Sequence, residues 1–370
     1  MPFSDFSLLP TLVDSLAAQA ITDPTDIQQR TLPELLGGAS LVGVAETGSG
    51  KTLAYVLPML HKLKTLENNG SAVSKNGHPR GVVLVPTREL GEQVCKVFKT
   101  LTHSTRMRVR SVLGGAARKI AKRNVNGAFE VMVATPGRLT QLLDDHHLHL
   151  ADVRMVVFDE ADQMLDPGFR PVARRIVRAC PHSAQVVMFS ATLPKELEAT
   201  AADLFHTTPV YIRTRGSRRL VKTLRVENRQ VTDGVRFDVL QAIFKKDKTS
   251  GTVLFANTRA QVDQVAAWLE DLGVSHLALR GELDPKERRA NLQRFRDGEV
   301  HALLTTDLGG RGLDIDRVER VINVHLPKDL DNYLHRAGRT ARAGRDGLVI
   351  NLVTGRDQDL MNLVKRNEGG

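Results

Sequence analysis

The fold of this chain is decided by one short stretch, Ala45-Glu46-Thr47-Gly48-Ser49-Gly50-Lys51-Thr52. An apolar run at 40–45 leads into it, and an amphipathic helical pattern at 53–66 follows it. Strand, glycine-rich turn and helix in this order form a phosphate-binding loop, because turn N–H groups and the helix dipole face the phosphates. Lys51 is then expected to reach the phosphates and Thr52 to bind Mg²⁺. A glycine-rich turn with an incidental lysine is the structural alternative.

A second pattern suits such a loop. The apolar run 154–158 leads directly into Asp159-Glu160-Ala161-Asp162. We expect Asp159 to hold Mg²⁺ through water, because Mg²⁺ keeps much of its hydration shell. Glu160 is expected to orient and deprotonate an attacking water molecule. Acidic residues also favour the first turn of any helix, which is the alternative for this segment.

Further along the chain, short Val/Ile/Leu-rich runs alternate with amphipathic stretches in two series. The first series lies at 40–45, 81–85, 130–134, 154–158 and 185–189, and the second at 252–256, 275–279, 301–305, 320–326 and 348–353. Runs that are apolar on both faces predict buried parallel strands in an α/β fold. The polar, basic segment between the series predicts two domains, 1–213 and 221–370, joined by a linker at 214–220. The polar segment 67–80 is expected to be a mobile surface loop.

Composition limits the classes of protein that this chain of 370 residues can be. Hydrophobic residues make up 41% and charged residues 25%, which excludes a mostly disordered chain or a collagen-like repeat. The two cysteines and the lack of a secretory signal or an apolar span indicate a reducing, cytoplasmic location away from membranes. The net charge of +10 favours nucleic acid as a partner. Because aromatic residues are only 4%, the nucleic-acid backbone is the expected contact.

Together, the phosphate loop and the Asp159–Asp162 motif resemble those of the DEAD-box ATP-dependent RNA helicases, and the resemblance extends along nearly the whole chain. It implies two tandem RecA-like domains and ATP with Mg²⁺ as cofactors. The segment 20–28 resembles the Q motif of the family, which would place Gln28 on the adenine edge and Phe3 against the adenine ring. The ATP-binding residues implied by the resemblance are Phe3, Ile21, Thr25, Gln28, Glu46, Thr47, Gly48, Ser49, Gly50, Lys51, Thr52, Gly312 and Asp314.

The resemblance also implies an RNA path, and strand-to-helix junctions suit it by offering N–H groups, a hydroxyl and an arginine to an anionic chain. The implied RNA contacts are Pro86, Thr87, Arg88, Gly114, Gly115, Thr135, Pro136, Gly137, Arg138, Asn257, Arg288, Thr306 and Gly309. Two departures from the family pattern lie near this path, Arg280 in place of histidine and Pro285 in place of glutamine.

The segment 335–342 resembles the arginine-finger motif of the family. Arg339 and Arg342 are three residues apart, on one helix face, and both are expected to address the γ-phosphate. The resemblance assigns coupling between the nucleotide site and domain closure to Asp162, Ser190, Thr192, His335 and Arg336. Without the family pattern, the arginines at 336, 339 and 342 would be a solvated basic face.

The implied activity is RNA-stimulated ATP hydrolysis that closes the two domains and locally unwinds or remodels RNA. An ATP-gated RNA clamp that does not unwind, and a DNA-directed helicase, are the alternatives. We expect a monomer that contacts the RNA backbone with little sequence specificity, besides protein partners of unknown kind. The histidine-rich segment 144–149 lacks tetrahedral metal-ligand spacing, so a solvated loop is favoured there over a metal site.

Overall fold

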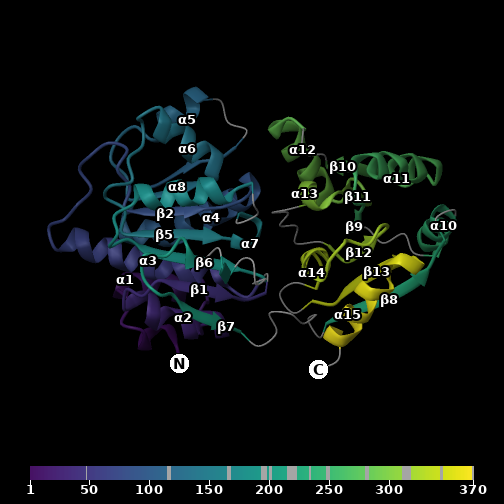
Figure 1. The fold of residues 1–370 in the computed structure, drawn as a ribbon, viewed down its shortest axis with the longest axis horizontal. Coiled ribbons are helices and arrows are strands. Elements are labelled where there is room, and N and C mark those ends of the chain that lie inside the picture. The colour runs from purple at the N-terminus through teal and green to yellow at the C-terminus, as the bar shows by residue number, and fades with distance from the viewer. Residues whose placement is uncertain are drawn as a thin grey trace. The chain divides into compact units, whose positions relative to one another are not determined.

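The computed structural model describes residues 1–46, 48–114, 118–164, 168–192, 198–199, 202–214, 223–232, 235–246, 251–279, 283–310, 318–341 and 345–368. The chain divides into two compact units, Met1–Ser217 and Arg218–Gly370 (Figure 1). This division falls within the predicted linker 214–220, of which all but the first residue lies outside the described residues.

Unit 1 is built on a parallel sheet with the strand order β3-β4-β2-β5-β6-β1-β7. The strands are β1 (Leu41–Val44), β2 (Gly81–Leu84), β3 (Val109–Val112), β4 (Val131–Ala134), β5 (Met155–Asp159), β6 (Gln185–Ser190) and β7 (Val210–Arg213). The five inner strands are buried on both faces, which explains their unbroken apolar sequences. The edge strands β3 and β7 were not predicted, because residues in each alternate between more and less exposed positions.

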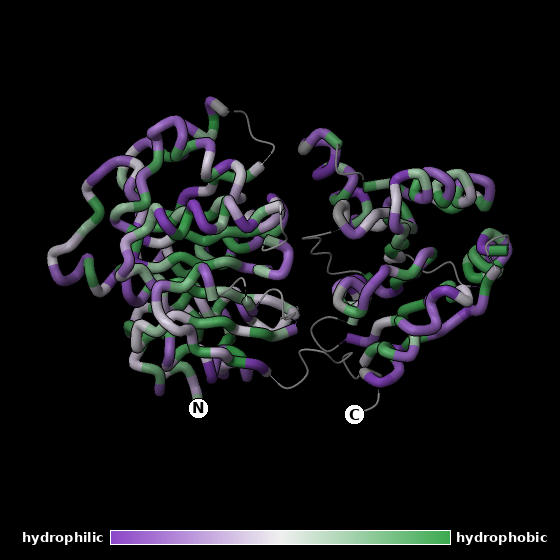
Figure 2. The backbone as a smooth tube through the Cα atoms, viewed as in Figure 1, coloured by the Kyte–Doolittle hydropathy of each residue, from purple (hydrophilic) through white to green (hydrophobic). Residues whose placement is uncertain are grey.

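Helices cover both faces of this sheet and enclose a hydrophobic cluster on each. The short 3₁₀ helix η1 (Phe3–Asp5) contributes to the face packed by α1 (Pro10–Ala17), α2 (Asp26–Leu36), α3 (Lys51–Asn68) and α4 (Arg88–Thr105). The opposite face is packed by α5 (Arg118–Asn124), α6 (Pro136–Asp144), α7 (Ala161–Met164) and α8 (Arg170–Ala179). Figure 2 shows the hydrophobic strands enclosed between these layers.

Unit 2 has a second parallel sheet, in the order β10-β11-β9-β12-β13-β8. Its strands are β8 (Leu224–Gln230), β9 (Thr252–Phe255), β10 (His276–Leu279), β11 (Ala302–Thr305), β12 (Arg320–Asn323) and β13 (Gly347–Val353). Hydrophobic clusters again lie on both faces. The helices of this unit are α10 (Arg236–Lys246), α11 (Arg259–Asp271), α12 (Pro285–Arg296), α13 (Asp307–Gly310), α14 (Leu330–Ala337) and α15 (Gln358–Glu368), and the 3₁₀ helix η3 (Gly355–Asp357) precedes α15.

Parallel strands place all their carboxyl ends at one edge of a sheet, where ligands of open α/β sheets bind. In unit 1 this edge receives the phosphate loop after β1 and the acidic motif at the end of β5. The segment predicted as a mobile loop, 67–80, lies elsewhere and is partly ordered. Its first residues belong to α3, and Gly77 exchanges backbone hydrogen bonds with Gly127 and His149. No helix within the described residues is long and apolar enough to span a bilayer.

Close packing under the phosphate loop gives a first prediction. Gly43 on β1 lies opposite Phe189 on β6, and a Cβ atom on Gly43 would meet the Phe189 ring at 2.5 Å. Because Phe189 is fully buried, Gly43→Ala should lower the free energy of unfolding by about 1–3 kcal/mol, as overpacked cores do. Gly168→Ala, with nothing within 4 Å of the added atom, is the control. Equal urea-unfolding midpoints for the two variants would contradict the packing argument.

Candidate functional site

The phosphate loop has the backbone geometry that its sequence predicts. Gly48 and Gly50 have φ values of +83° and +91°, in the left-handed region that favours glycine. Gly50 caps α3, and Lys51 begins that helix. The Lys51 ammonium folds back over the loop, where Nζ donates to the carbonyl oxygens of Ala45 at 2.6 Å and Glu46 at 3.1 Å. The loop therefore holds a cation at its centre.

Burial lowers the pKa of Lys51, while the carboxylates of Asp159, Glu160, Asp162 and Glu46 act in the opposite direction. Burial likewise raises the pKa of Glu46, and Lys51 opposes that shift. The ammonium and the acidic motif are therefore electrostatically coupled across the carboxyl edge of the sheet. This is the arrangement expected of a site for a phosphate group and a divalent cation.

Asp159 lies at the end of β5 and is 2% exposed. Its Oδ2 accepts a hydrogen bond from the Tyr55 hydroxyl at 2.8 Å, and its Oδ1 accepts one from the Glu160 N–H at 3.0 Å. Burial first, and then repulsion from Glu160, raise the pKa of Asp159 to about 6, against the opposing charge of Lys51. A carboxylate in this state gains from a nearby cation. Together with the Thr52 hydroxyl at the start of α3, it offers the hard oxygen ligands that Mg²⁺ prefers.

Glu160 adopts a φ of +56°, which is uncommon for a residue other than glycine and is typical of functional sites. Its Oε2 accepts a hydrogen bond from Nε2 of Gln163 at 2.6 Å. The other amide atom of Gln163, Oε1, is buried and has no partner within the described part of the protein. The strained backbone and this amide fix the direction of the carboxylate that is predicted to act as general base.

Hydrogen bonds join the segment Ser190–Thr192 to Asp162, and Ser190, Thr192 and Asp162 are three residues of the predicted coupling group. Ser190 Oγ accepts from the backbone N–H of Asp162 at 3.3 Å, and the Thr192 hydroxyl donates to the Asp162 carboxylate at 3.2 Å. In addition, the backbone N–H of Ala45 donates to the Ser190 carbonyl at 3.0 Å. The segment after β6 thus connects the acidic motif with the start of the phosphate loop.

The predicted adenine-reading segment packs directly on the phosphate loop. Oε1 of Gln28 accepts from the Thr25 N–H, and Nε2 donates to the Gly50 carbonyl, both at 2.9 Å. Ile21 packs partly buried against the adjoining core. The prediction for Phe3 needs correction. Its ring is 2% exposed within the hydrophobic cluster, so no ring face is open to stack on a base.

The predicted RNA contacts of unit 1 gather at the carboxyl ends of β2, β3 and β4. Arg88, at the start of α4, donates from Nη1 to the Gly114 carbonyl at 3.3 Å and pairs through Nε with Glu92. Thr87 caps α4, and Pro86 precedes it. Thr135 caps α6, whose first residues are Pro136, Gly137 and Arg138. These residues form a strip at the same edge of the sheet as the nucleotide loop, from which β5 and β6 separate it.

In unit 2, the coupling role predicted for Arg336 stays a prediction, and the structure shows how this side chain is held within the unit. This side chain is 1% exposed, and a guanidinium has five N–H donors. All five are used within unit 2, on the Asp307 carboxylate, Asn257 Oδ1, Asn323 Oδ1 and the His325 carbonyl. The guanidinium also lies 5.1 Å above the Phe255 ring. Arg336 therefore joins the segments that follow β9, β11 and β12.

Other predicted site residues of unit 2 are also tied to one another. Arg288 donates from Nη2 to the Gly309 carbonyl at 2.7 Å, and the Gly309 N–H donates to the Thr306 hydroxyl at 3.2 Å. Asn257, the predicted RNA contact after β9, is held by Arg336 and by the Leu326 carbonyl. The Arg339 Nε donates to the His335 carbonyl at 3.2 Å. Five predicted residues lie outside the described residues, namely Thr47, Gly115, Gly312, Asp314 and Arg342.

Comparison with known proteins identifies the family. The model of DEAD/DEAH box helicases matches residues 25–200, and that of the helicase conserved C-terminal domain matches residues 235–344. The chain belongs to the DEAD-box helicases. It is 32% identical over 363 residues to the ATP-dependent RNA helicase CshA of Listeria monocytogenes, covering 98% of this chain and 68% of that protein. It is 35% identical over 354 residues to the ATP-dependent RNA helicase DBP2 of Saccharomyces cerevisiae, covering 94% and 64%.

Solved structures of the family agree with the fold. The structure of S. cerevisiae Dbp5 bound to RNA and ADP BeF3 matches with a TM-score of 0.85 and 27% identity, covering 99% of this chain and 93% of that one. Both units are RecA-like domains, as the sequence predicted. The DEAD-box chain spans less than half of some relatives, such as 46% of the DEAD-box ATP-dependent RNA helicase 24 of Oryza sativa.

Sequence reasoning missed several residues that build the site. Tyr55 holds Asp159, and its place four residues after Lys51 on the inner face of α3 was an available signal. Gln163 follows the acidic motif directly and binds the Glu160 carboxylate, a contact that the motif itself does not predict. Asp307 begins α13 after β11, and Asn323 ends β12, on the other side of β9 in the sheet. Both bind Arg336, but only the fold brings these three residues together.

The raised pKa of Asp159 predicts a stability effect of pH. Because its pKa rises from 3.8 to about 6 on folding, the carboxyl stabilises the fold when protonated, and that contribution is lost as pH rises between these values. Asp159→Asn should therefore be more stable than the parent protein at pH 8, by on the order of 2 kcal/mol, and not at pH 4. Thermal unfolding with EDTA and without nucleotide measures this. Asp14→Asn, on the exposed side of α1, is the control, and a pH-independent difference for Asp159→Asn would refute the cause assigned.

Because Arg336 makes five hydrogen bonds inside unit 2, replacing it should lower the free energy of unfolding of this unit. Arg336→Lys keeps the charge but cannot reproduce the planar set of donors, so it should destabilise unit 2 by about 2–4 kcal/mol. Arg366→Lys, exposed on α15, is the matched control. Urea unfolding resolves the two cases. Normal stability combined with a large loss of ATP hydrolysis would instead favour the coupling role.

Proposed function

We propose that this chain is an RNA-dependent ATPase that remodels or unwinds RNA duplexes, using Mg²⁺ with ATP. The observation that carries the proposal is the partly buried Lys51 ammonium, which interacts electrostatically with Asp159 and Glu160 at the sheet edge that also presents Arg88 and Gly114. One edge thus holds a phosphate loop, a hard-cation site and a strip suited to an RNA backbone. Relatives named as ATP-dependent RNA helicases cover nearly the whole chain.

In this proposal each residue of unit 1 has a stated task. Lys51 leaves the carbonyl oxygens of Ala45 and Glu46 for the phosphate oxygens, which replace them as acceptors. Thr52 and Asp159 hold Mg²⁺, which supplies charge neutralisation at the phosphates when bound. Glu160 accepts a proton from the attacking water, and Gln163 keeps its carboxylate in place.

RNA dependence follows from the strip at the same edge of the sheet and from unit 2. Arg88, Thr135 and Arg138 are placed to contact RNA phosphates and sugars, and such contacts carry little sequence information. We propose that Arg339 and Arg342 of unit 2 complete the site at the γ-phosphate when ATP and RNA hold the units together. Hydrolysis then requires both ligands, because the catalytic groups come from both units.

An ATP-gated clamp that binds RNA without separating strands would use the same residues. The relatives' names favour strand separation, and a duplex-displacement assay beside an ATPase assay decides between the two.

We further propose a monomer in the cytoplasm. Both described cysteines are free thiols, which is typical of proteins from reducing compartments.

Removing the loop lysine tests the proposed function. Lys51→Ala should reduce RNA-stimulated ATP hydrolysis to the background rate, because the phosphates lose the cation at the centre of the loop. Lys64→Ala, on the same helix but paired with Glu67 at its surface, should behave as the parent protein. Phosphate release is measured with RNA, with DNA of the same sequence and without nucleic acid. Hydrolysis that is unchanged in Lys51→Ala, or that RNA does not stimulate, would reject the proposal.

A further inference from the structure

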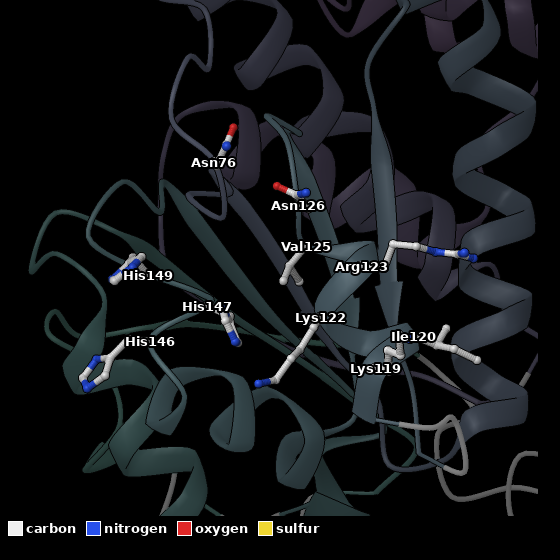
Figure 3. A pocket seen from close by; sticks show the side chains of 10 residues that line it. All are labelled: Asn76, Lys119, Ile120, Lys122, Arg123, Val125, Asn126, His146, His147 and His149. Atoms are coloured by element: carbon white, nitrogen blue, oxygen red, sulfur yellow. The ribbon is translucent and has the colours of Figure 1, made fainter.

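A second concave site lies in unit 1, away from the nucleotide loop. It is an open pocket of about 790 Å³ between α5 and two loop segments. Figure 3 shows Lys119, Lys122 and Arg123 on α5 on one side and the histidine segment on the other. The residues that line it are Asn76, Lys119, Ile120, Lys122, Arg123, Val125, Asn126, His146, His147 and His149.

Backbone contacts fix the walls of this pocket. The Gly77 N–H donates to the Gly127 carbonyl at 3.4 Å, and the His149 N–H donates to the Gly77 carbonyl at 2.9 Å. A Cβ atom on Gly77 would lie 2.5 Å from the His147 carbonyl oxygen, so glycine allows the two loops to approach. The His149 ring stacks on His78 with 4.6 Å between ring centroids. Three segments that are distant in sequence therefore meet here in a defined arrangement.

Three of the ten residues that line the pocket are Lys or Arg, and five more carry a side chain with a polar nitrogen. Lys119 lies three residues before Lys122 on α5, so these two lysines share a side of the helix. Figure 3 shows the adjacent Arg123 pointing in another direction. Lys122 extends toward the histidine segment, and its Nζ lies 3.9 Å from the Asp145 carboxylate (Figure 3). Neighbouring Asp144 is paired with Arg175 of α8 instead. Imidazole and amide side chains complete the lining, so the site suits an anion with several oxygen acceptors.

A phosphate backbone fits these features better than an acidic protein partner does. Of the ten lining residues only Ile120 and Val125 are apolar, whereas protein interfaces rely on large apolar anchors. The position of α5 adds a second argument. Its first described residue, Arg118, follows Gly114 by four positions, and Gly114 belongs to the predicted RNA strip through its contact with Arg88. Seven helical residues span about 10 Å, so α5 leads from that strip along the pocket.

We propose that this pocket binds phosphates of an RNA segment that extends beyond the strand held at the carboxyl edge of the sheet. The proposal rests on the proposed function and adds a contact outside the motifs of the family. The pocket would lengthen the RNA-binding surface of unit 1 and increase affinity for long RNA. It would not alter the chemistry at Lys51 and Glu160. A free polyphosphate presents the same phosphate groups. Dependence of the affinity on RNA length distinguishes RNA from polyphosphate as the ligand.

The test reverses two charges of the pocket with the double variant Lys119→Glu/Lys122→Glu. Its matched control is Lys96→Glu/Lys99→Glu, which reverses two lysines at the same spacing on the exposed side of α4. Affinities for oligouridine strands of about 10 and about 30 nucleotides are measured over a range of salt concentrations. For the pocket variant we expect binding of the long strand to weaken roughly three- to tenfold and binding of the short strand to remain unchanged. The slope of log K against log salt for the long strand should fall by about 1.4, the loss of two phosphate contacts.

Three results would overturn the proposal. If the pocket variant binds the long strand as tightly as the control variant does, RNA does not contact the pocket. If binding weakens equally for both strand lengths, the effect is a general effect of charge. Competition by inorganic triphosphate for the long strand at the pocket, without any length dependence, would assign the site to a free polyphosphate. RNA-stimulated ATP hydrolysis by the parent protein is measured in parallel. Its absence would reject the proposed function, whereas its presence with unchanged long-strand binding would reject the pocket alone.

Discussion

The rest of unit 1 depends on one interaction, the burial of the Lys51 ammonium between two loop carbonyls and a group of carboxylates. The carbonyls of Ala45 and Glu46 accept hydrogen bonds from the Lys51 ammonium. The carboxylates of Asp159 and Glu160, at the end of β5, stabilise its positive charge. Burial of Asp159 itself, and then repulsion from Glu160, raise the pKa of Asp159 to about 6, although the charge of Lys51 acts in the opposite direction. The site therefore contains a cation and anions that solvate one another incompletely. A phosphate group and a hard cation relieve both, because they bring opposite charges to groups already desolvated.

In unit 2 the corresponding charged group at the carboxyl edge of the sheet is Arg336. Its five donors bind groups that follow three strands, so the last turn of α14 is fixed. Arg339 lies beyond the end of α14, in a turn rather than on the predicted helix face, and its Nε donates to the His335 carbonyl of that helix. The guanidinium of Arg336, which is hydrogen-bonded inside unit 2, thus fixes the backbone that leads to Arg339, the residue proposed to act on ATP.

The sequence predicted the inner strands and the nucleotide site because both leave local patterns. Strands buried on two faces are continuous apolar runs, and the phosphate loop is a contiguous stretch. The edge strands β3, β7 and β8 were missed, since their residues are only partly buried and carry Arg110, Arg213 and Arg229. The burial of Phe3 and the partners of Arg336 were missed for a different reason. Both depend on residues far apart in sequence, which only the fold brings together.

The Q segment shows how such contacts carry information about the nucleotide. Gln28 donates to the carbonyl of Gly50, and a Cβ atom on Gly50 would lie 2.4 Å from that same amide. The residue that is expected to read adenine therefore rests on the glycine that caps α3. Any shift of the amide toward a base changes the hydrogen bonding of the loop around Lys51. We therefore expect recognition of the base and placement of the phosphates to be linked, because the elements predicted to contact the two ends of the nucleotide share a hydrogen bond.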